Sequence, residues 1–159
     1  MEADRRRRTL DPETRIETLT ELIHANGHDE ATNLLLKCDI EGAEWDIFGE
    51  TSNQVLRMFR QIITEMHELG KIGGDQFAER VRRALTNLTA TRRVVHVHGN
   101  NHGNCLVYGG VPLPVILELT LVRIDAGTLK VSDETFPTPL DRPNHPERTD
   151  YHLGQFAFD

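Results

Sequence analysis

The chain has 159 residues, 38% hydrophobic and 27% charged, which fits one folded domain and argues against wholesale disorder. Acidic residues outnumber basic ones by 25 to 18, so we expect no nucleic-acid partner; the arginines of the basic tail, residues 1–8, are interpreted as solvated. No apolar run reaches the roughly 18 residues that span a bilayer, and no secretory signal follows the basic start. Cys38 and Cys105 cannot form a disulfide framework, so a cytoplasmic location is the default expectation.

The first predicted elements are a helix and a strand. Residues 11–13, Asp-Pro-Glu, have the N-cap acid and first-turn proline of a helix start, and Ile16 to Ile23 carry apolar residues at helical spacing. Asn26-Gly27 predicts the end of that helix. The short apolar run Leu34–Cys38 then predicts a strand that is buried on both faces.

The middle of the chain predicts a turn, two short helices and a second strand. Residues 39–42 form the turn, and residues 43–48 and 54–59 predict helices that are separated by a break at Gly49. Residues 61–66 are rich in β-branched side chains and predict the second strand. A polar loop at residues 71–74 follows.

The second half predicts a helix and two further strands. Asp75 is predicted to cap a helix whose apolar stripe ends at Leu88. Residues 94–98 predict the third strand, and residues 115–124 the fourth, with residues 106–108 pairing nearby. A polar loop, residues 99–104, follows the third strand.

Prolines at positions 137, 139, 143 and 146 indicate that residues 125–159 form a tail ordered by docking onto the domain. The element pattern α-β-α-β-α-β-β predicts an α/β fold with parallel strands and helical crossovers. Ligands in such sheets bind at the carboxyl ends of the strands. We therefore expect the polar residues that follow the first three strands to meet at one rim.

Residues 37–44 have the pattern Lys-x-Asp-x-Glu-Gly-Ala-Glu directly after an apolar strand, and DIEGAEW covers residues 39–45. This segment resembles one that recurs in S-adenosylmethionine (SAM) dependent methyltransferases of the FkbM type. Further similar segments follow in the same order: residues 63–67, 96–101, 115–123 and 139–146. The resemblance covers about Thr9 to Phe158.

The resemblance implies a three-layer αβα, Rossmann-like sheet that transfers a methyl group from SAM to a hydroxyl of a small-molecule acceptor. The sulfonium donor is already activated, so the protein aligns the acceptor oxygen and removes its proton. By position, the resemblance makes Asp39 the first candidate base, beside Glu41, and His67 the second. The expected acceptor contacts are Glu65, His98, Asn100 and Asn101.

The chain departs from the family before Leu34. Complete members have three earlier strands, the first ending in a glycine-rich cofactor loop, and this sequence contains no Gly-x-Gly. We therefore expect residues 9–159 to be the C-terminal half of a methyltransferase-like domain, with weak or no SAM binding by itself. A targeting or anchor segment further upstream would change the expected location.

Other functions remain open at the level of the sequence. One is a non-catalytic remnant that self-associates or binds a partner protein at the open edge of the Leu34–Cys38 strand. A weaker one is a metal-dependent hydrolase that uses the His/Asp/Glu rim. The spacing of His96, His98, His102 and Cys105 could suit zinc, but it matches no closed structural-zinc pattern. Rim histidines held by polar partners are the simpler interpretation, so no metal site is predicted.

Overall fold

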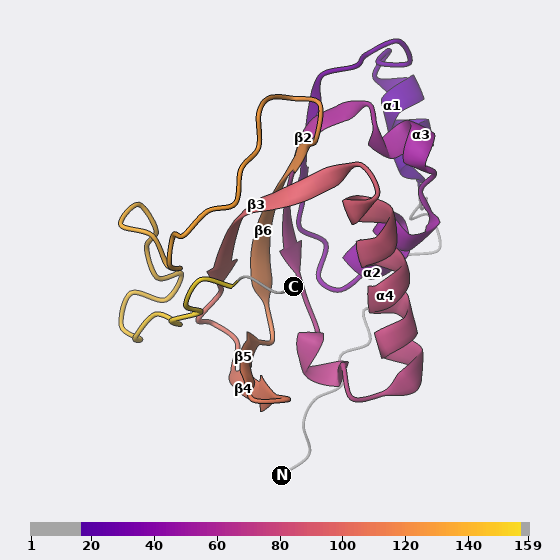
Figure 1. Cartoon of the computed structure of the whole chain (residues 1–159). Coiled ribbons are helices and arrows are strands. Elements are labelled where there is room, and N and C mark those ends of the chain that lie inside the picture. Colours follow the sequence, from indigo (N-terminus) through magenta and orange to yellow (C-terminus); the bar gives the residue numbers. More distant parts are fainter. Residues whose placement is uncertain (1–16, 157–159) are drawn as a thin grey trace.

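A computed structural model describes residues 17–156, which form a mixed α/β fold around a four-stranded sheet of order β1-β2-β6-β3 (Figure 1). β1 (Leu34–Cys38) is parallel to β2 (Phe59–Met66), whereas β6 (Leu117–Arg123) lies antiparallel between β2 and β3 (Arg92–Gly99). Since β3 is antiparallel to β6, it runs in the same direction as β1 and β2. The carboxyl ends of β1, β2 and β3 therefore share one edge of the sheet, as the sequence predicted.

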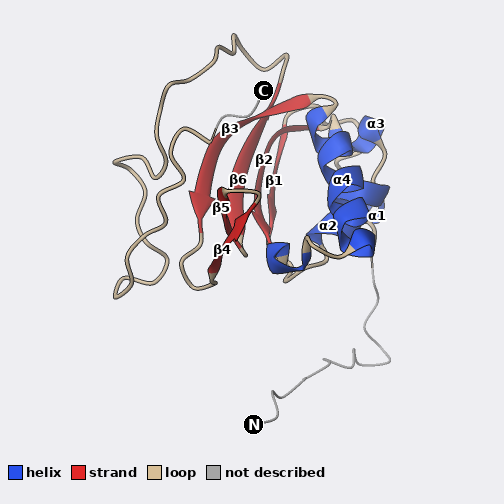
Figure 2. Cartoon of the chain, turned by 60° about the horizontal axis from the view of Figure 1, so that its bottom comes forward, coloured by secondary structure: helices blue, strands red, loops and turns tan. Residues whose placement is uncertain are grey.

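The helices pack on one face of this sheet (Figure 2). The longest, α4, is amphipathic and buries its apolar stripe against the sheet because Phe77, Val81, Ala84 and Leu88 recur at helical spacing. None of the helices in the described part of the chain is long and apolar enough to cross a membrane. The helical elements are α1 (Leu19–Ala25), α2 (Glu44–Glu50), α3 (Asn53–Leu56), the 3-10 helix η1 (Leu69–Lys71) and α4 (Asp75–Thr89).

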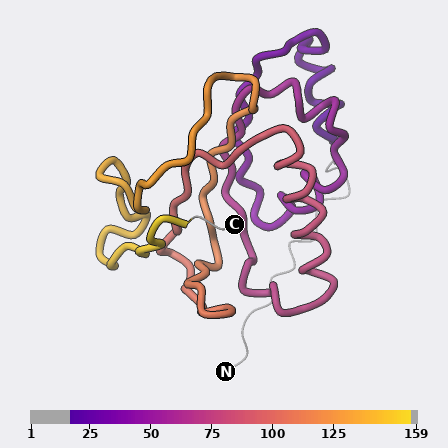
Figure 3. Tube along the Cα trace, in the orientation of Figure 1, coloured from indigo at the N-terminus to yellow at the C-terminus, as the bar shows by residue number. Residues whose placement is uncertain are grey.

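The opposite face of the sheet differs from the predicted three-layer arrangement. Within residues 17–156 no helix lies on that face; the segment 125–156 runs beside β3 there instead (Figures 2 and 3). β1 is an edge strand of the sheet, and Leu35, which points away from the helices, is 60% exposed. The expectation that β1 is buried on both faces is therefore wrong for this part of the chain.

Helix α1 begins later than the sequence suggested. Residues 17 and 18 are not helical. Thr18 is the N-cap, and its capping box with Glu21 starts the helix at Leu19. The predicted start at residues 11–13 lies outside the described residues, as does the basic tail, residues 1–8. The predicted end is confirmed, since Asn26 is the C-cap and Gly27 has φ +68°.

Gly49 does not break a helix, contrary to prediction. α2 continues through it to Glu50, and a Cβ at Gly49 would lie 2.8 Å from Nε of Arg83 on α4. The Arg83 side chain would have to move to admit a larger residue at position 49. The break falls at Ser52 instead, whose hydroxyl accepts a hydrogen bond from Val55 N–H.

Two other predicted boundaries differ from the structure. Phe59 begins β2 rather than ending a helix, and Gly74, not Asp75, is the N-cap of α4.

A small hairpin lies between β3 and β6. It consists of β4 (Cys105–Tyr108) and β5 (Val111–Pro114), joined by Gly109 and Gly110, which both have positive φ. Two consecutive residues of positive φ are typical of the tight turns that match strand twist, so the glycines explain the hairpin. The expected pairing of residues 106–108 is thus confirmed.

Candidate functional site

A buried histidine–glutamate pair joins the end of β2 to the start of α2. Nδ1 of His67 lies 2.9 Å from Oε1 of Glu44, whose side chain has no exposed surface. The same carboxylate accepts hydrogen bonds of 2.9 Å from the backbone N–H groups of Ile40 and Gly42. Because a carboxylate accepts from Nδ1, that nitrogen carries a proton, and Nε2 is the atom left to react.

The turn between β1 and α2 places Glu44 under His67. Glu41 and Gly42 have φ values of +58° and +109°, and the turn directs the N–H groups of Ile40 and Gly42 to one carboxylate. A Cβ at Gly42 would also lie 3.2 Å from Cδ of Glu68, which leaves little space for a larger residue. The N-terminus of α2 favours the negative charge of Glu44.

Trp45 ties the same two elements together a second time. Its Nε1–H donates a 2.7 Å hydrogen bond to the backbone carbonyl of His67, and its ring meets Phe77 of α4 edge-on at 5.8 Å. Trp45 and Phe48 are both buried in the hydrophobic core. The segment DIEGAEW therefore forms a rigid support for the His67 side chain.

Three carboxylates surround Nε2 of His67 without hydrogen-bonding to it. The nearest oxygens belong to Glu65 at 3.6 Å, Glu41 at 3.7 Å and Asp39 at 4.0 Å. The Asp39 side chain is 41% exposed and that of Glu41 is 84% exposed, so this rim is open on one side. One ligand atom from each of Asp39, Glu65 and His67 lies within 4.8 Å of the other two.

Glu65 is the most enclosed of these three carboxylates. Burial raises its pKa, and the neighbouring Asp39 raises it further, whereas a hydrogen bond from the Asn100 amide and the charge of His67 lower it. Lys37 lies 3.4 Å from Asp39 and is the one lysine or arginine that is paired with these carboxylates in the described part of the chain. The rim therefore carries excess negative charge.

The structure brings together Asp39, Glu41, Glu65, His67 and Asn100 among the predicted site residues, but not His98 and Asn101. His98 is buried and lies between Glu118, at 3.3 Å, and Asp150, at 3.0 Å. Both groups of the Asn101 amide bind the backbone of the C-terminal segment, at His145 and Arg148. The polar atoms of His98 and Asn101 are thus bound to the C-terminal segment, and the acceptor contacts expected at these two positions stay predictions.

Two histidines of the spacing that could suit zinc, His96 and His98, pair with acidic residues of the C-terminal segment. His96 lies 3.0 Å from Asp141 and contacts Phe136 edge-on, while His98 pairs with Glu118 and Asp150. Both histidines thus have acidic partners, as the simpler interpretation held. The group of side chains whose ligand atoms do converge is Asp39, Glu65 and His67.

Docking of the C-terminal segment is expected to weaken as pH rises. Burial lowers the pKa of His98, but hydrogen bonds to Asp150 and Glu118 outweigh it, so the net shift is upward. The stabilisation is fully present below the unfolded-state pKa of about 6.5 and is lost as pH rises through the higher folded pKa. Protection of the Phe136 and Leu153 amides, which hydrogen-bond across the segment, should fall as pH rises above about 6.5 in hydrogen exchange.

The matched variants for this pH experiment are His98→Gln and His24→Gln. The first should abolish the pH dependence of protection, and the second should leave it unchanged because the His24 side chain is 80% exposed. Equal pH dependence in both variants would contradict the role of His98.

Glu44 is the site residue that sequence reasoning missed. Glu44 belongs to the segment DIEGAEW. Its position in the first turn of a helix, directly after a glycine turn, is the feature of the sequence that could have identified it. A first-turn acid usually interacts with its own helix end, so its bond to His67 depends on how β2 lies beside β1. Cys38 is no nucleophile here, since burial raises the pKa of its thiol to about 11.

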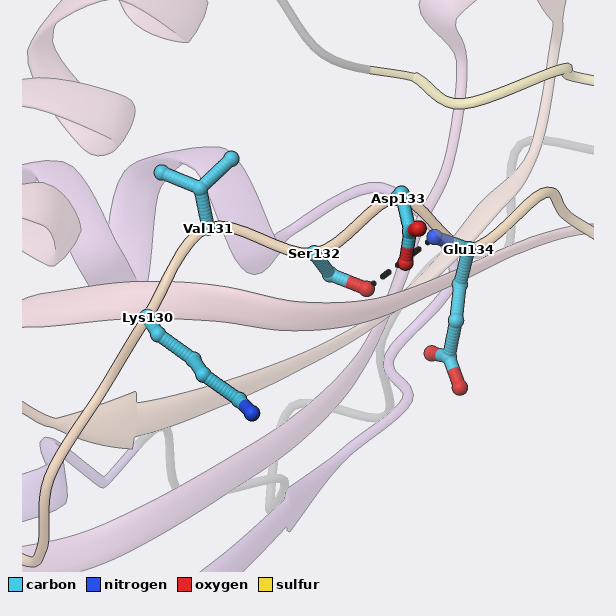
Figure 4. A pocket seen from close by; sticks show the side chains of 5 residues that line it. All are labelled: Lys130, Val131, Ser132, Asp133 and Glu134. Carbon is cyan, nitrogen blue, oxygen red and sulfur yellow. Dashed lines mark hydrogen bonds between the residues drawn. The ribbon is translucent and has the colours of Figure 1, made fainter.

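A shallow hollow elsewhere on the surface is unrelated to this rim (Figure 4). It is lined by five consecutive residues, 130–134, of the C-terminal segment, and its one internal hydrogen bond runs from Glu134 N–H to the Ser132 hydroxyl at 3.1 Å. Its polar side chains do not gather around one point, so the hollow has no cluster of reactive groups like that of the rim.

Comparison with known proteins gives no relative for this chain: no family model, no curated protein and no solved structure matches it.

Proposed function

We propose that this chain supplies the acceptor side of a SAM-dependent O-methyl transfer. The place of the recognised segment in the fold supports the proposal. The segment DIEGAEW, on which the resemblance to FkbM-type methyltransferases rests, forms the support of a polar rim at the carboxyl ends of β1 and β2. Clusters at such strand ends are where ligands of α/β sheets bind.

The single observation that carries the proposal is the orientation of His67 by buried Glu44. A histidine whose Nδ1 is held by a carboxylate presents Nε2 as a proton acceptor, as a general base requires. The acceptor hydroxyl would give its proton to Nε2 while its oxygen takes the methyl carbon from the sulfonium, which becomes a neutral thioether. Asp39 and Glu65 would stabilise the imidazolium that forms.

This geometry changes the order of the candidate bases. Asp39 was the first candidate by position, but it lies on the exposed side of the rim beside Lys37. A carboxylate paired with an ammonium group is a weaker base than an oriented imidazole near neutral pH. His67 is therefore the preferred base, and Asp39 and Glu41 assist by their charge.

The proposal includes a SAM-binding half that would continue the sheet from the free edge of β1. By itself the chain is expected to bind SAM no tighter than about 100 μM, equivalent to about −5.5 kcal/mol, because it contains no glycine-rich loop. The test fuses to it the strands of a methyltransferase that carry this loop and measures transfer of labelled methyl from SAM to sugars, polyketides and lipids. A fusion that binds SAM and methylates none of them would contradict the proposal.

The second candidate function is association through β1, and the exposed edge favours it. Within the described residues, one side of the β1 backbone has no strand partner, and Leu35 adds an apolar side chain beside it. We expect the chain to dimerise or aggregate at about 100 μM in light scattering. Leu35→Lys should restore a monomer, whereas Val131→Lys, at a side chain 95% exposed elsewhere, should not; a monomeric wild-type chain would refute this function.

A further inference from the structure

We infer that Asp39, Glu65 and His67 bind a divalent first-row transition-metal ion, and that Glu44 orients the imidazole ligand. The inference rests on the arrangement of these side chains and does not require methyl transfer. A metal-dependent reaction at this rim was the weaker alternative at the level of the sequence, and a bound ion would replace His67 as the group that activates the acceptor hydroxyl.

The spacing of the three groups suits a shared ion. Nε2 of His67 lies 3.6 Å from Glu65 Oε2 and 4.0 Å from Asp39 Oδ1, and one ligand atom from each residue lies within 4.8 Å of the others. Two donor atoms that are each about 2.1 Å from an ion lie roughly 3 to 4 Å apart. Rotation of the part-exposed Asp39 side chain would close the remaining gap.

His67 is an independent indication of a ligand. Its side chain is about nine-tenths buried, Nδ1 is occupied by Glu44, and Nε2 makes no hydrogen bond to any residue in 17–156. Its lone pair would face three carboxylates, at distances too long for hydrogen bonds. A cation between these groups removes the repulsion and satisfies Nε2.

The charge balance and the donor set define the kind of ion. Asp39, Glu41, Glu44 and Glu65 surround one imidazole, and Lys37 is the one ammonium group paired with them among the described residues. One nitrogen and two carboxylate ligands suit ions such as Mn²⁺ and Zn²⁺ better than Mg²⁺ or Ca²⁺. Glu44 is the acidic partner that metal-binding histidines usually have on their other nitrogen.

A bound ion would change the role of His67 in the proposed reaction. Nε2 would then be a ligand, and the ion would increase the acidity of an acceptor hydroxyl in one of its open positions. The hydroxyl proton would go to Glu41, which lies outside the ligand set and is open to solvent. Three protein ligands leave such positions free, as in catalytic rather than structural sites.

The test is calorimetric titration of the purified chain with MnCl₂, with ZnCl₂ and MgCl₂ as parallel arms, and Mn²⁺ electron paramagnetic resonance to count bound ions. We expect one ion per chain. Asp39→Asn and Glu65→Gln should each weaken binding at least about tenfold, and Glu44→Gln by about 10- to 100-fold without removing a ligand. Glu79→Gln and His24→Gln, at exposed side chains outside the rim, should bind as the wild-type chain does.

Two results would overturn the inference. One is the absence of stoichiometric Mn²⁺ or Zn²⁺ uptake by the wild-type chain. The other is equal affinity in Asp39→Asn, Glu65→Gln and the controls, which would mean diffuse binding to an acidic surface. Asp39 is exposed enough that its variant should keep the fold, as thermal unfolding would check. Metal binding is measured without SAM and SAM binding without metal, so failure of one proposal is distinguishable from failure of the other.

Discussion

Replacement of Glu44 by alanine is expected to lower the free energy of unfolding by about 3–5 kcal/mol. The substitution removes the acceptor of three donors: Nδ1–H of buried His67, the backbone N–H of buried Gly42, and the backbone N–H of Ile40, which is part-buried. Each buried donor without a partner costs about 1–3 kcal/mol, and a cavity adds to the loss. Urea unfolding of both proteins at pH 7 measures the difference.

Glu79→Ala is the matched control for this experiment. Glu79 pairs with Arg82 on the exposed surface of α4, where solvent screens the pair, so its loss should cost far less than the loss of Glu44. Glu44→Gln should fall between the two, because it keeps the shape and one acceptor oxygen. If Glu44→Ala costs no more than Glu79→Ala, water reaches the turn and Glu44 does not hold His67.

The second large effect concerns turnover in the chain joined to a SAM-binding half. His67→Gln removes the oriented nitrogen and is expected to lower turnover by about 10²- to 10⁴-fold, the usual contribution of a positioned base. Asp39→Asn should lower turnover at least about tenfold, since it removes a charge 4.0 Å from Nε2. Neither change should alter the SAM dissociation constant by more than about threefold, because both residues lie on the acceptor side.

Steady-state kinetics together with SAM calorimetry separate these effects. His24→Gln removes an exposed histidine far from the rim and should leave turnover unchanged. A turnover loss smaller than tenfold in His67→Gln would show that the residue supports the fold and does not take part in the reaction. Loss of SAM affinity in the same variant would instead place His67 on the cofactor side.

The strands and the composition of the rim could be predicted from local sequence, but the roles of individual rim residues could not. Residues 39–41, 65–67 and 98–101 lie at or directly after the carboxyl ends of β1, β2 and β3, so parallel strand direction alone brings them to one edge. His98 and Asn101 belong to that group by sequence, yet their polar atoms bind the segment 145–150. No periodicity could reveal this, because the partners lie over 40 residues away in the chain.

The sequence by itself determined where the strands lie, that polar groups follow them, and that a glycine turn connects β1 to α2. These features follow from short-range preferences, such as apolar runs and positive φ at Gly42. Only the tertiary structure decided that Glu44 holds His67, that α2 continues through Gly49 beside Arg83 of α4, and that helices cover one face of the described sheet. Each of these features depends on which elements, far apart in the chain, come into contact. A local sequence pattern does not contain this information, because it is the same for any packing partner.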